Sequence, residues 1–121
     1  MLFTNMEYKA MESSLDSLWL KQQVITNNLA NSDTPGFKSK TVSFENVLAD
    51  RMGDKKSNRE YDYRSKIVTD NGTEARPDGN NVDVEKESAE LWRAYAQYSY
   101  LTGKISGSFK NMNYVLNQAF K

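Results

Sequence analysis

Four acidic side chains gather near the start of the last third of the chain, and their types and spacing are the nearest thing to a chemical site. Asp83, Glu85, Glu87 and Glu90 lie within eight residues, after the turn-forming run Asp78-Gly79-Asn80-Asn81. A carboxylate pair can act as general acid and base, but it needs an apolar pocket or a second catalytic group, and nothing here supplies either. The spacing also fails the calcium-loop pattern. We therefore interpret these acids as stabilising the positive end of a helix.

The sequence also lacks the residue types on which other common catalytic and metal-binding sites depend. The sequence contains no cysteine and no histidine, which removes thiolate catalysis, most transition-metal sites and the usual neutral-pH base. The 16 basic residues balance the 16 acidic ones, so no net charge favours nucleic acid as a partner. We predict no catalytic, cofactor-binding or metal-binding residues and no enzyme activity.

The clearest structural pattern lies in two segments at the ends of the chain, which we expect to form long helices. In the first, large side chains recur with gaps of three and four residues, which is the 3.5-residue repeat of a coiled-coil seam. The polar Gln22 is an exception within it. The members of this seam are Tyr8, Met11, Leu15, Leu18, Gln22, Ile25 and Leu29.

The C-terminal segment carries a longer seam of the same period. Gly103 and Gly107 interrupt it, and they either weaken the helix or allow close approach by a neighbouring helix. Phe109, Leu116 and Phe120 lie beside the seam and widen its apolar arc. The seam consists of Val84, Glu87, Leu91, Ala94, Tyr98, Leu101, Ile105, Ser108, Met112, Val115 and Ala119.

One antiparallel helix pair cannot cover its seam and all the remaining aromatic residues as well. Trp19, Trp92 and Tyr95 lie outside the seams, and apolar surface left in this way marks an interaction site or an aggregation liability. We expect other subunits to complete the core. The residues predicted to pack between subunits are Leu15, Leu18, Ile25, Leu101, Ile105, Phe109, Met112, Val115, Leu116 and Phe120.

The middle of the chain is more polar. Thr41-Val42-Ser43-Phe44 alternates as a short strand does, although Phe44, Val47 and Leu48 could share a helical turn. From Asp50 to Asn81 large apolar residues are sparse, so we expect disorder until a partner covers this stretch.

These patterns predict a mainly α fold. Two long terminal helices pack as an antiparallel coiled coil and are joined by a polar, extended or partly disordered segment with little β structure. The expected division is an N-terminal helix and turn in 1–38, a flexible middle in 39–83 and a C-terminal helix in 84–121, forming one structural unit.

The first helix ends in a run of turn-forming residues. Three asparagines, an Asp-Thr pair and Pro35-Gly36 occur where its apolar repeat ends. Pro35 and Gly36 suit the centre of a type II turn, in which Gly36 needs a positive φ. The run reads Asn27-Asn28-Leu29-Ala30-Asn31-Ser32-Asp33-Thr34-Pro35-Gly36-Phe37-Lys38.

This run resembles the Ala-Asn-x-x-Thr-Pro-Gly-Phe signature near the N-terminus of bacterial flagellar rod and hook proteins. A second run, from Arg76 to Glu87, resembles the segment that opens the C-terminal helix in the flagellar basal-body rod proteins, and the proximal-rod members in particular. The matching motif residues are Asn28, Leu29, Ala30, Asn31, Thr34, Pro35, Gly36, Phe37, Asn81, Val82 and Asp83.

The resemblance implies a structural axial subunit that polymerises into the rod crossing the periplasm and transmits motor torque. It implies other rod subunits, proteins of the junction between MS ring and rod, and the type III export apparatus as partners. No basic and apolar leader is evident at the start of the sequence, so we expect export without a cleaved signal peptide and no direct membrane insertion. The alternative is a soluble coiled-coil adaptor or secretion chaperone, which needs the seams but not both motifs.

Overall fold

The chain folds into two long helices and one β-hairpin. The computed structural model describes residues 5–48, 61–73 and 75–120. The elements are, in chain order, helix α1 (Asn5–Ala30), strand β1 (Lys40–Leu48), strand β2 (Tyr61–Thr69) and helix α2 (Val84–Ala119). The mainly α fold built on two long terminal helices is thus confirmed.

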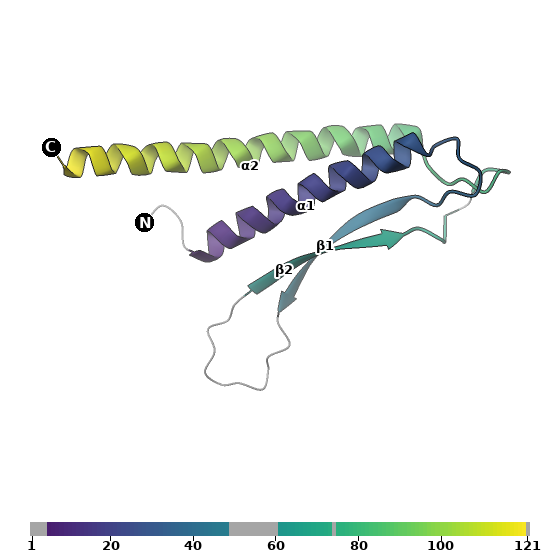
Figure 1. Cartoon of the computed structure of the whole chain (residues 1–121), viewed down its shortest axis with the longest axis horizontal. Coiled ribbons are helices and arrows are strands. Elements are labelled where there is room, and N and C mark those ends of the chain that lie inside the picture. Colours follow the sequence, from purple (N-terminus) through teal and green to yellow (C-terminus); the bar gives the residue numbers. More distant parts are fainter. Residues whose placement is uncertain (1–4, 49–60, 74, 121) are drawn as a thin grey trace.

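The two helices run antiparallel (Figure 1). They lie closest where α1 ends and α2 begins, and they diverge toward the start of α1. Large side chains still meet at the divergent end, because the rings of Tyr8 and Phe109 have centroids 6.2 Å apart. With 36 residues against 26, α2 is the longer helix, and its C-terminal part extends past the start of α1.

Helix α2 starts at Val84 because the preceding residue caps it. The Asp83 carboxylate accepts hydrogen bonds from the backbone N–H groups of Glu85 and Lys86, at 3.1 and 3.2 Å. These N–H groups have no carbonyl partner inside the helix, so an acceptor at the N-cap position satisfies them. Asp83 therefore stabilises the N-terminus of α2, as the sequence predicts for this acid.

The heptad pattern predicts correctly which face of each helix is covered. Gln22 and Ile25 are buried on α1, and Glu87, Ala94 and Ser108 are buried on α2 at seam positions. The cover is incomplete at both ends of the longer seam. Val84, its first member, is 48% exposed, because it lies in the first turn of α2 at the end of the helix pair.

The middle of the chain is more regular than its composition predicts. Strands β1 and β2 pair antiparallel from Lys40 opposite Thr69 to Leu48 opposite Tyr61. The expected disorder is therefore wrong for residues 61–69, and the helical turn considered for Phe44, Val47 and Leu48 is replaced by strand. Backbone pairing with β1 orders this segment without burial of large side chains. Residues 49–60 lie outside the described part of the chain.

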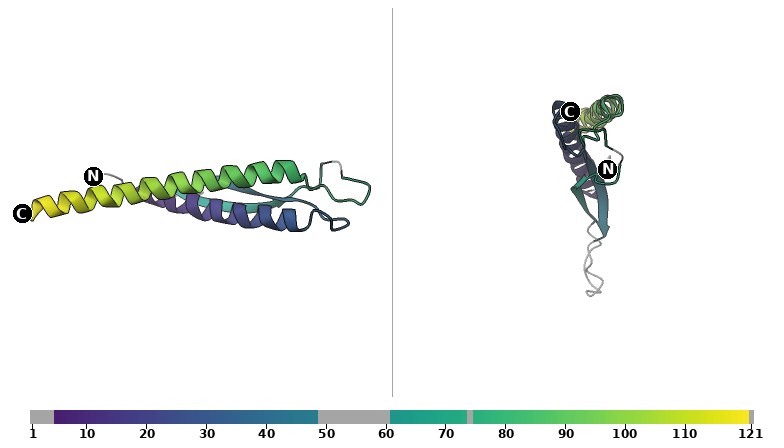
Figure 2. Two further views of the ribbon diagram at one scale, coloured as in Figure 1. Left: turned by 90° about the horizontal axis from the view of Figure 1, so that it is seen from above. Right: turned by 90° about the vertical axis from the view of Figure 1, so that its right-hand side faces the viewer.

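Helix α1 is the central layer, with α2 on one side and the hairpin on the other (Figure 2). The buried apolar core among the described residues is small, consisting of Val24, Ile25, Val82 and Ala94. Many large apolar side chains stay exposed, Trp19, Trp92 and Tyr95 among them, as expected for a chain that does not complete its own core.

Candidate functional site

The two motifs of the sequence, far apart along the chain, meet in the structure at the end of the helix pair. The first contributes the tight turn after α1. Phe37 N–H donates to the Thr34 carbonyl at 3.3 Å, and Gly36 has a φ of 73°. The closing hydrogen bond and the positive φ at the third turn residue agree with the predicted type II turn.

A second glycine, Gly79, packs directly against this turn. Gly79 has a φ of 84°, and a Cβ atom placed on it would lie 3.3 Å from the Gly36 Cα atom. Hydrogen bonds flank the contact: Gly36 N–H donates to the Asp78 carbonyl at 2.8 Å, and the Lys38 ammonium donates to the Gly79 carbonyl at 2.8 Å. The two backbones approach this closely because Gly79 carries no side chain, whereas a Cβ atom on Gly36 would meet nothing within 4 Å.

Three asparagine side chains, Asn28, Asn80 and Asn81, tie the surrounding backbone together, and we call them with their partners the asparagine clasp. Asn80 is fully buried. Its amide nitrogen donates to the carbonyls of Asn31 and Thr34 at 2.8 and 2.9 Å, and its oxygen accepts from Val82 N–H at 2.8 Å. One side chain thereby satisfies three backbone groups, two in the turn after α1 and one just before α2.

The other two asparagines join the helices to the hairpin. Asn28, also fully buried, donates to the Lys40 carbonyl at 2.7 Å and accepts from Lys40 N–H at 3.0 Å. Asn81 accepts from Ser39 N–H at 2.6 Å and donates to the Asp70 carbonyl at 2.8 Å. Each amide thus bonds the backbone through both its oxygen and its nitrogen.

Two carboxylates on α2 lie close to the clasp. Burial raises the pKa of the Glu87 carboxyl above its ordinary value, and a hydrogen bond from Asn28 opposes the shift. One turn later, the Lys21 ammonium lies 3.1 Å from the Glu90 carboxylate, and this contact lowers the pKa of Glu90. Glu87 is an acid at a packed helix contact.

The other residues of the family motif have varied positions. Val82 is buried and Asp83 caps α2, whereas Leu29, Asn31 and Phe37 are half-buried. Ala30, Thr34, Pro35 and Gly36 lie at the exposed surface of the turn.

Asn80 and Gly79 are not among the motif residues identified from the sequence, although both lie inside the run from Arg76 to Glu87. The Asp-Gly-Asn-Asn order indicates a turn. It does not show which asparagine is buried.

The residues predicted to pack between subunits fall into two groups. Ile25 is buried in the chain, and Leu15, Leu18, Leu101 and Ile105 are half-buried between the helices. The rest lie in the last part of α2 or directly after it, and they form what we call the C-terminal arc: Phe109, Met112, Val115, Leu116 and Phe120, all exposed.

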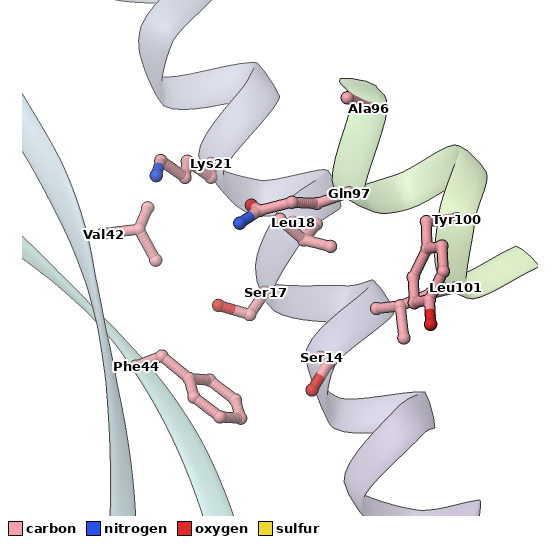
Figure 3. Close-up of a pocket in the computed structure, with 10 residues that line it drawn as sticks. All are labelled: Ser14, Ser17, Leu18, Lys21, Val42, Phe44, Ala96, Gln97, Tyr100 and Leu101. Carbon is pink, nitrogen blue, oxygen red and sulfur yellow. The ribbon is translucent and has the colours of Figure 1, made fainter. Parts of the chain in front are cut away.

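A groove of about 660 Å³ lies between α1, α2 and the hairpin (Figure 3). Phe44 and Val42 of β1 form one wall, Leu18 lies at its centre, and Tyr100 and Leu101 of α2 form the other wall. The Phe44 and Tyr100 side chains remain partly exposed, so the groove is a second uncovered apolar surface.

Reactive groups do not gather at the clasp or in the groove. Within residues 5–48, 61–73 and 75–120, no group of three or more acidic side chains is arranged to hold a metal ion. Over the same residues, neither helix contains the long apolar run that a membrane span requires. The features that stand out are a backbone held by hydrogen bonds at one end of the molecule and uncovered apolar surface along the rest.

Comparison with known proteins gives this arrangement a family. The profile of the family described as flagella basal body rod protein matches residues 14–38, which include the turn and Asn28. The flagellar basal body rod protein FlgB of Bacillus subtilis is 38% identical over 116 residues, covering 88% of this chain and 89% of the relative.

More distant relatives carry the same name. FlgB of Borreliella burgdorferi is 32% identical over 120 residues, covering 84% of this chain and 89% of the relative. FlgB of Escherichia coli is 27% identical over 118 residues, with 79% and 82% covered. An identity of 38% over 88% of the chain shows that the chain belongs to the flagellar basal-body rod protein FlgB family.

Proposed function

We propose that the chain is a non-enzymatic, structural subunit of the proximal part of the bacterial flagellar basal-body rod. In this role it polymerises with other axial proteins into the shaft that transmits motor torque. Its partners are neighbouring rod subunits and proteins at the junction of MS ring and rod. It reaches the rod through the type III export apparatus, without cleavage of a signal peptide.

The observation that carries this proposal is the C-terminal arc. The face of α2 that packs on α1 continues beyond Ser108, where its large apolar side chains are exposed, although the ring of Phe109 still lies 6.2 Å from that of Tyr8 on α1. Phe120 is 87% exposed, and full burial of one large apolar side chain contributes about 1.5–3 kcal/mol. A subunit that keeps such a surface uncovered gains this stabilisation only when another chain covers it.

The asparagine clasp supports a mechanical role. It fixes the connection between the two helices and the hairpin through hydrogen bonds to the backbone, which hold one geometry better than apolar packing alone. A subunit of a rotating shaft needs such a fixed connection, because torque must pass between its elements without bending them.

The proposed function can be tested by measuring motility and the recovery of the subunit in purified basal bodies. In a strain that lacks its own copy, the chain is expected to restore motility and to be recovered in purified basal bodies. Phe120→Ala is expected to abolish recovery, since loss of a fully buried phenylalanine costs about 3–5 kcal/mol at each interface. The matched control is Gln118→Ala, an exposed polar position on the same turn of α2, and it should assemble normally.

The alternative function gives a different result. A secretion chaperone or adaptor stays in the cytoplasm and is absent from basal bodies, whichever residue occupies position 120. Equal recovery of Phe120→Ala and Gln118→Ala in basal bodies would leave the rod function in place but remove the C-terminal arc as its interface.

A further inference from the structure

The turn that follows β2 contains a pair of residues prone to spontaneous chemical change. Asn71 and Gly72 form the one Asn-Gly pair of the sequence, and both are exposed. The Gly72 nitrogen can attack the side-chain amide carbon of Asn71, because glycine has no side chain to block the approach. Within the described part of the chain, the Asn71 side chain makes no hydrogen bond that would hold it away from this attack.

The reaction is an intramolecular substitution at the Asn71 side chain. The backbone nitrogen of Gly72 loses its proton to hydroxide or water and forms a bond to the amide carbon. The bond from this carbon to the side-chain nitrogen breaks, and that nitrogen takes up a proton and leaves as ammonia. Water then opens the resulting succinimide ring, which leaves aspartate or isoaspartate at position 71. The net change consumes water and releases ammonia, and no other reactant is needed.

The residue before the pair engages the nitrogen that would attack. Gly72 N–H donates to the Asp70 carboxylate at 3.0 Å, and Thr73 donates to the same carboxylate through its N–H, also at 3.0 Å, and through its hydroxyl. The hydrogen bond from the Thr73 hydroxyl, followed by those from the two N–H groups, lowers the pKa of the Asp70 carboxyl. The backbone of Asp70 is fixed as well, because its N–H donates to the Ser39 carbonyl and its carbonyl accepts from Asn81, both at 2.8 Å.

We propose that Asn71 is a deamidation site and that Asp70 slows the reaction there. The Gly72 N–H is directed at the Asp70 carboxylate, so this hydrogen bond must break before the nitrogen can lose its proton and approach the Asn71 side chain. The negative charge of the carboxylate also disfavours the amide anion that forms when the proton leaves. The contact protects the asparagine clasp, because isoaspartate at position 71 would lengthen the backbone directly after Asp70, the residue that Asn81 holds.

Asp70→Ala tests the protection, because it removes the acceptor of the Gly72 N–H and leaves the backbone hydrogen bonds of residue 70 in place. The full chain is incubated at neutral pH, and mass spectrometry of its peptides follows the mass increase that marks replacement of the Asn71 amide by a carboxyl group. We expect the variant to deamidate at least threefold faster than the wild type. Equal rates in the two proteins would overturn the proposal.

The matched control adds Gly72→Ala to Asp70→Ala. A Cβ atom on Gly72 makes only an ordinary contact of 3.9 Å in the folded chain, but it hinders attack by the nitrogen that carries it. The double variant should therefore deamidate at least threefold more slowly than Asp70→Ala alone. A double variant that reacts as fast as Asp70→Ala would show that Gly72 is not the attacking residue, and the proposal would be wrong.

A measurement on the wild-type chain keeps the proposal testable even if Asp70→Ala disturbs the fold. Base-catalysed hydrogen exchange of the Gly72 amide requires loss of the same proton as deamidation does. Although Gly72 is exposed, its amide should exchange at least threefold more slowly in the folded chain than in the chain unfolded by urea, because the Asp70 carboxylate holds the N–H. Nuclear magnetic resonance gives both rates after correction for the effect of urea on exchange. A Gly72 amide that exchanges equally fast in the two states would overturn the protection by Asp70.

Discussion

At the scale of the residue, Gly36 and Gly79 hold conformations that other residues rarely adopt. Both have positive φ, and Gly79 also lies against the backbone of Gly36. The first glycine could be predicted, because Pro35 before it indicates a type II turn. The second has no such neighbour, and its contact with Gly36 depends on the approach of a segment more than 40 residues away.

Alanine at the two glycines should therefore have unequal effects. Gly36→Ala is expected to cost about 1–2 kcal/mol of the free energy of unfolding, the usual penalty for a left-handed conformation. Gly79→Ala should cost more, since its Cβ atom would also press on the Gly36 Cα atom at 3.3 Å. Gly72→Ala is the control, with only an ordinary contact of 3.9 Å to the Asp70 side chain. Urea unfolding curves, measured by circular dichroism, rank the three variants by their loss in free energy of unfolding. Equal losses at positions 36 and 79 would contradict the close approach.

The buried Glu87 makes stability depend on pH. Burial raises the pKa of its carboxyl in the folded chain, so the unfolded chain releases the proton at a lower pH. Between the ordinary value of 4.5 and the raised value the folded state binds more protons, and stability falls as the pH rises through this window.

Glu87→Gln removes the ionisation, so this variant should gain stability relative to the wild type between pH 4 and pH 7. Glu85→Gln changes a neighbouring exposed acid and should show no comparable gain. Unfolding curves for the three proteins at both pH values provide the measurement. A Glu87→Gln variant that loses stability toward pH 7, relative to the wild type, would show that the carboxylate is favourable where it lies.

At the scale of the element, the longer helix contains two glycines whose role the sequence left open. A Cβ atom on Gly103 or on Gly107 would meet no other atom within 4 Å in the described chain. No neighbour within the chain therefore requires either glycine.

Gly103→Ala should stabilise α2 in the isolated chain by about 0.5–1 kcal/mol, because alanine has the higher helix propensity. Assembly distinguishes the two roles that remain. Unchanged recovery in basal bodies would identify Gly103 as a simple weakness of the helix, whereas loss of recovery would indicate close approach by a neighbouring subunit. A fall in the helix stability of the isolated variant would contradict the open space around this residue.

The elements also show what the sequence could and could not predict. Heptad spacing identified the covered face of each helix, since residues such as Ile25 and Ala94 recur at seam positions and are buried. Composition missed strand β2, because its order comes from backbone pairing with β1 rather than from apolar side chains. It missed the buried Asn80 for the same reason: hydrogen bonds to the backbone, not hydrophobicity, hold that residue inside.

At the scale of the whole molecule, order should decrease from the clasp toward the tip of α2. The clasp end combines hydrogen-bonded loops, a capped helix and most of the buried residues, whereas the tip carries only exposed side chains. Local stability follows buried contacts, and helical hydrogen bonds without them open easily. A chain built in this way completes its folding when its neighbours bind.

Hydrogen exchange can compare the two ends directly. In dilute monomer, backbone amides of residues 109–119 should exchange rapidly while those of residues 87–98 are protected, because the second segment holds the buried Glu87 and Ala94 whereas every residue of the first is exposed. In purified basal bodies the first segment should become protected too, since a neighbouring copy then covers the C-terminal arc. The protected segment 87–98 is the internal control and should change little between the two states. Strong protection of residues 109–119 already in the monomer would show that α2 is stable without a partner, and would contradict the view that assembly completes this helix.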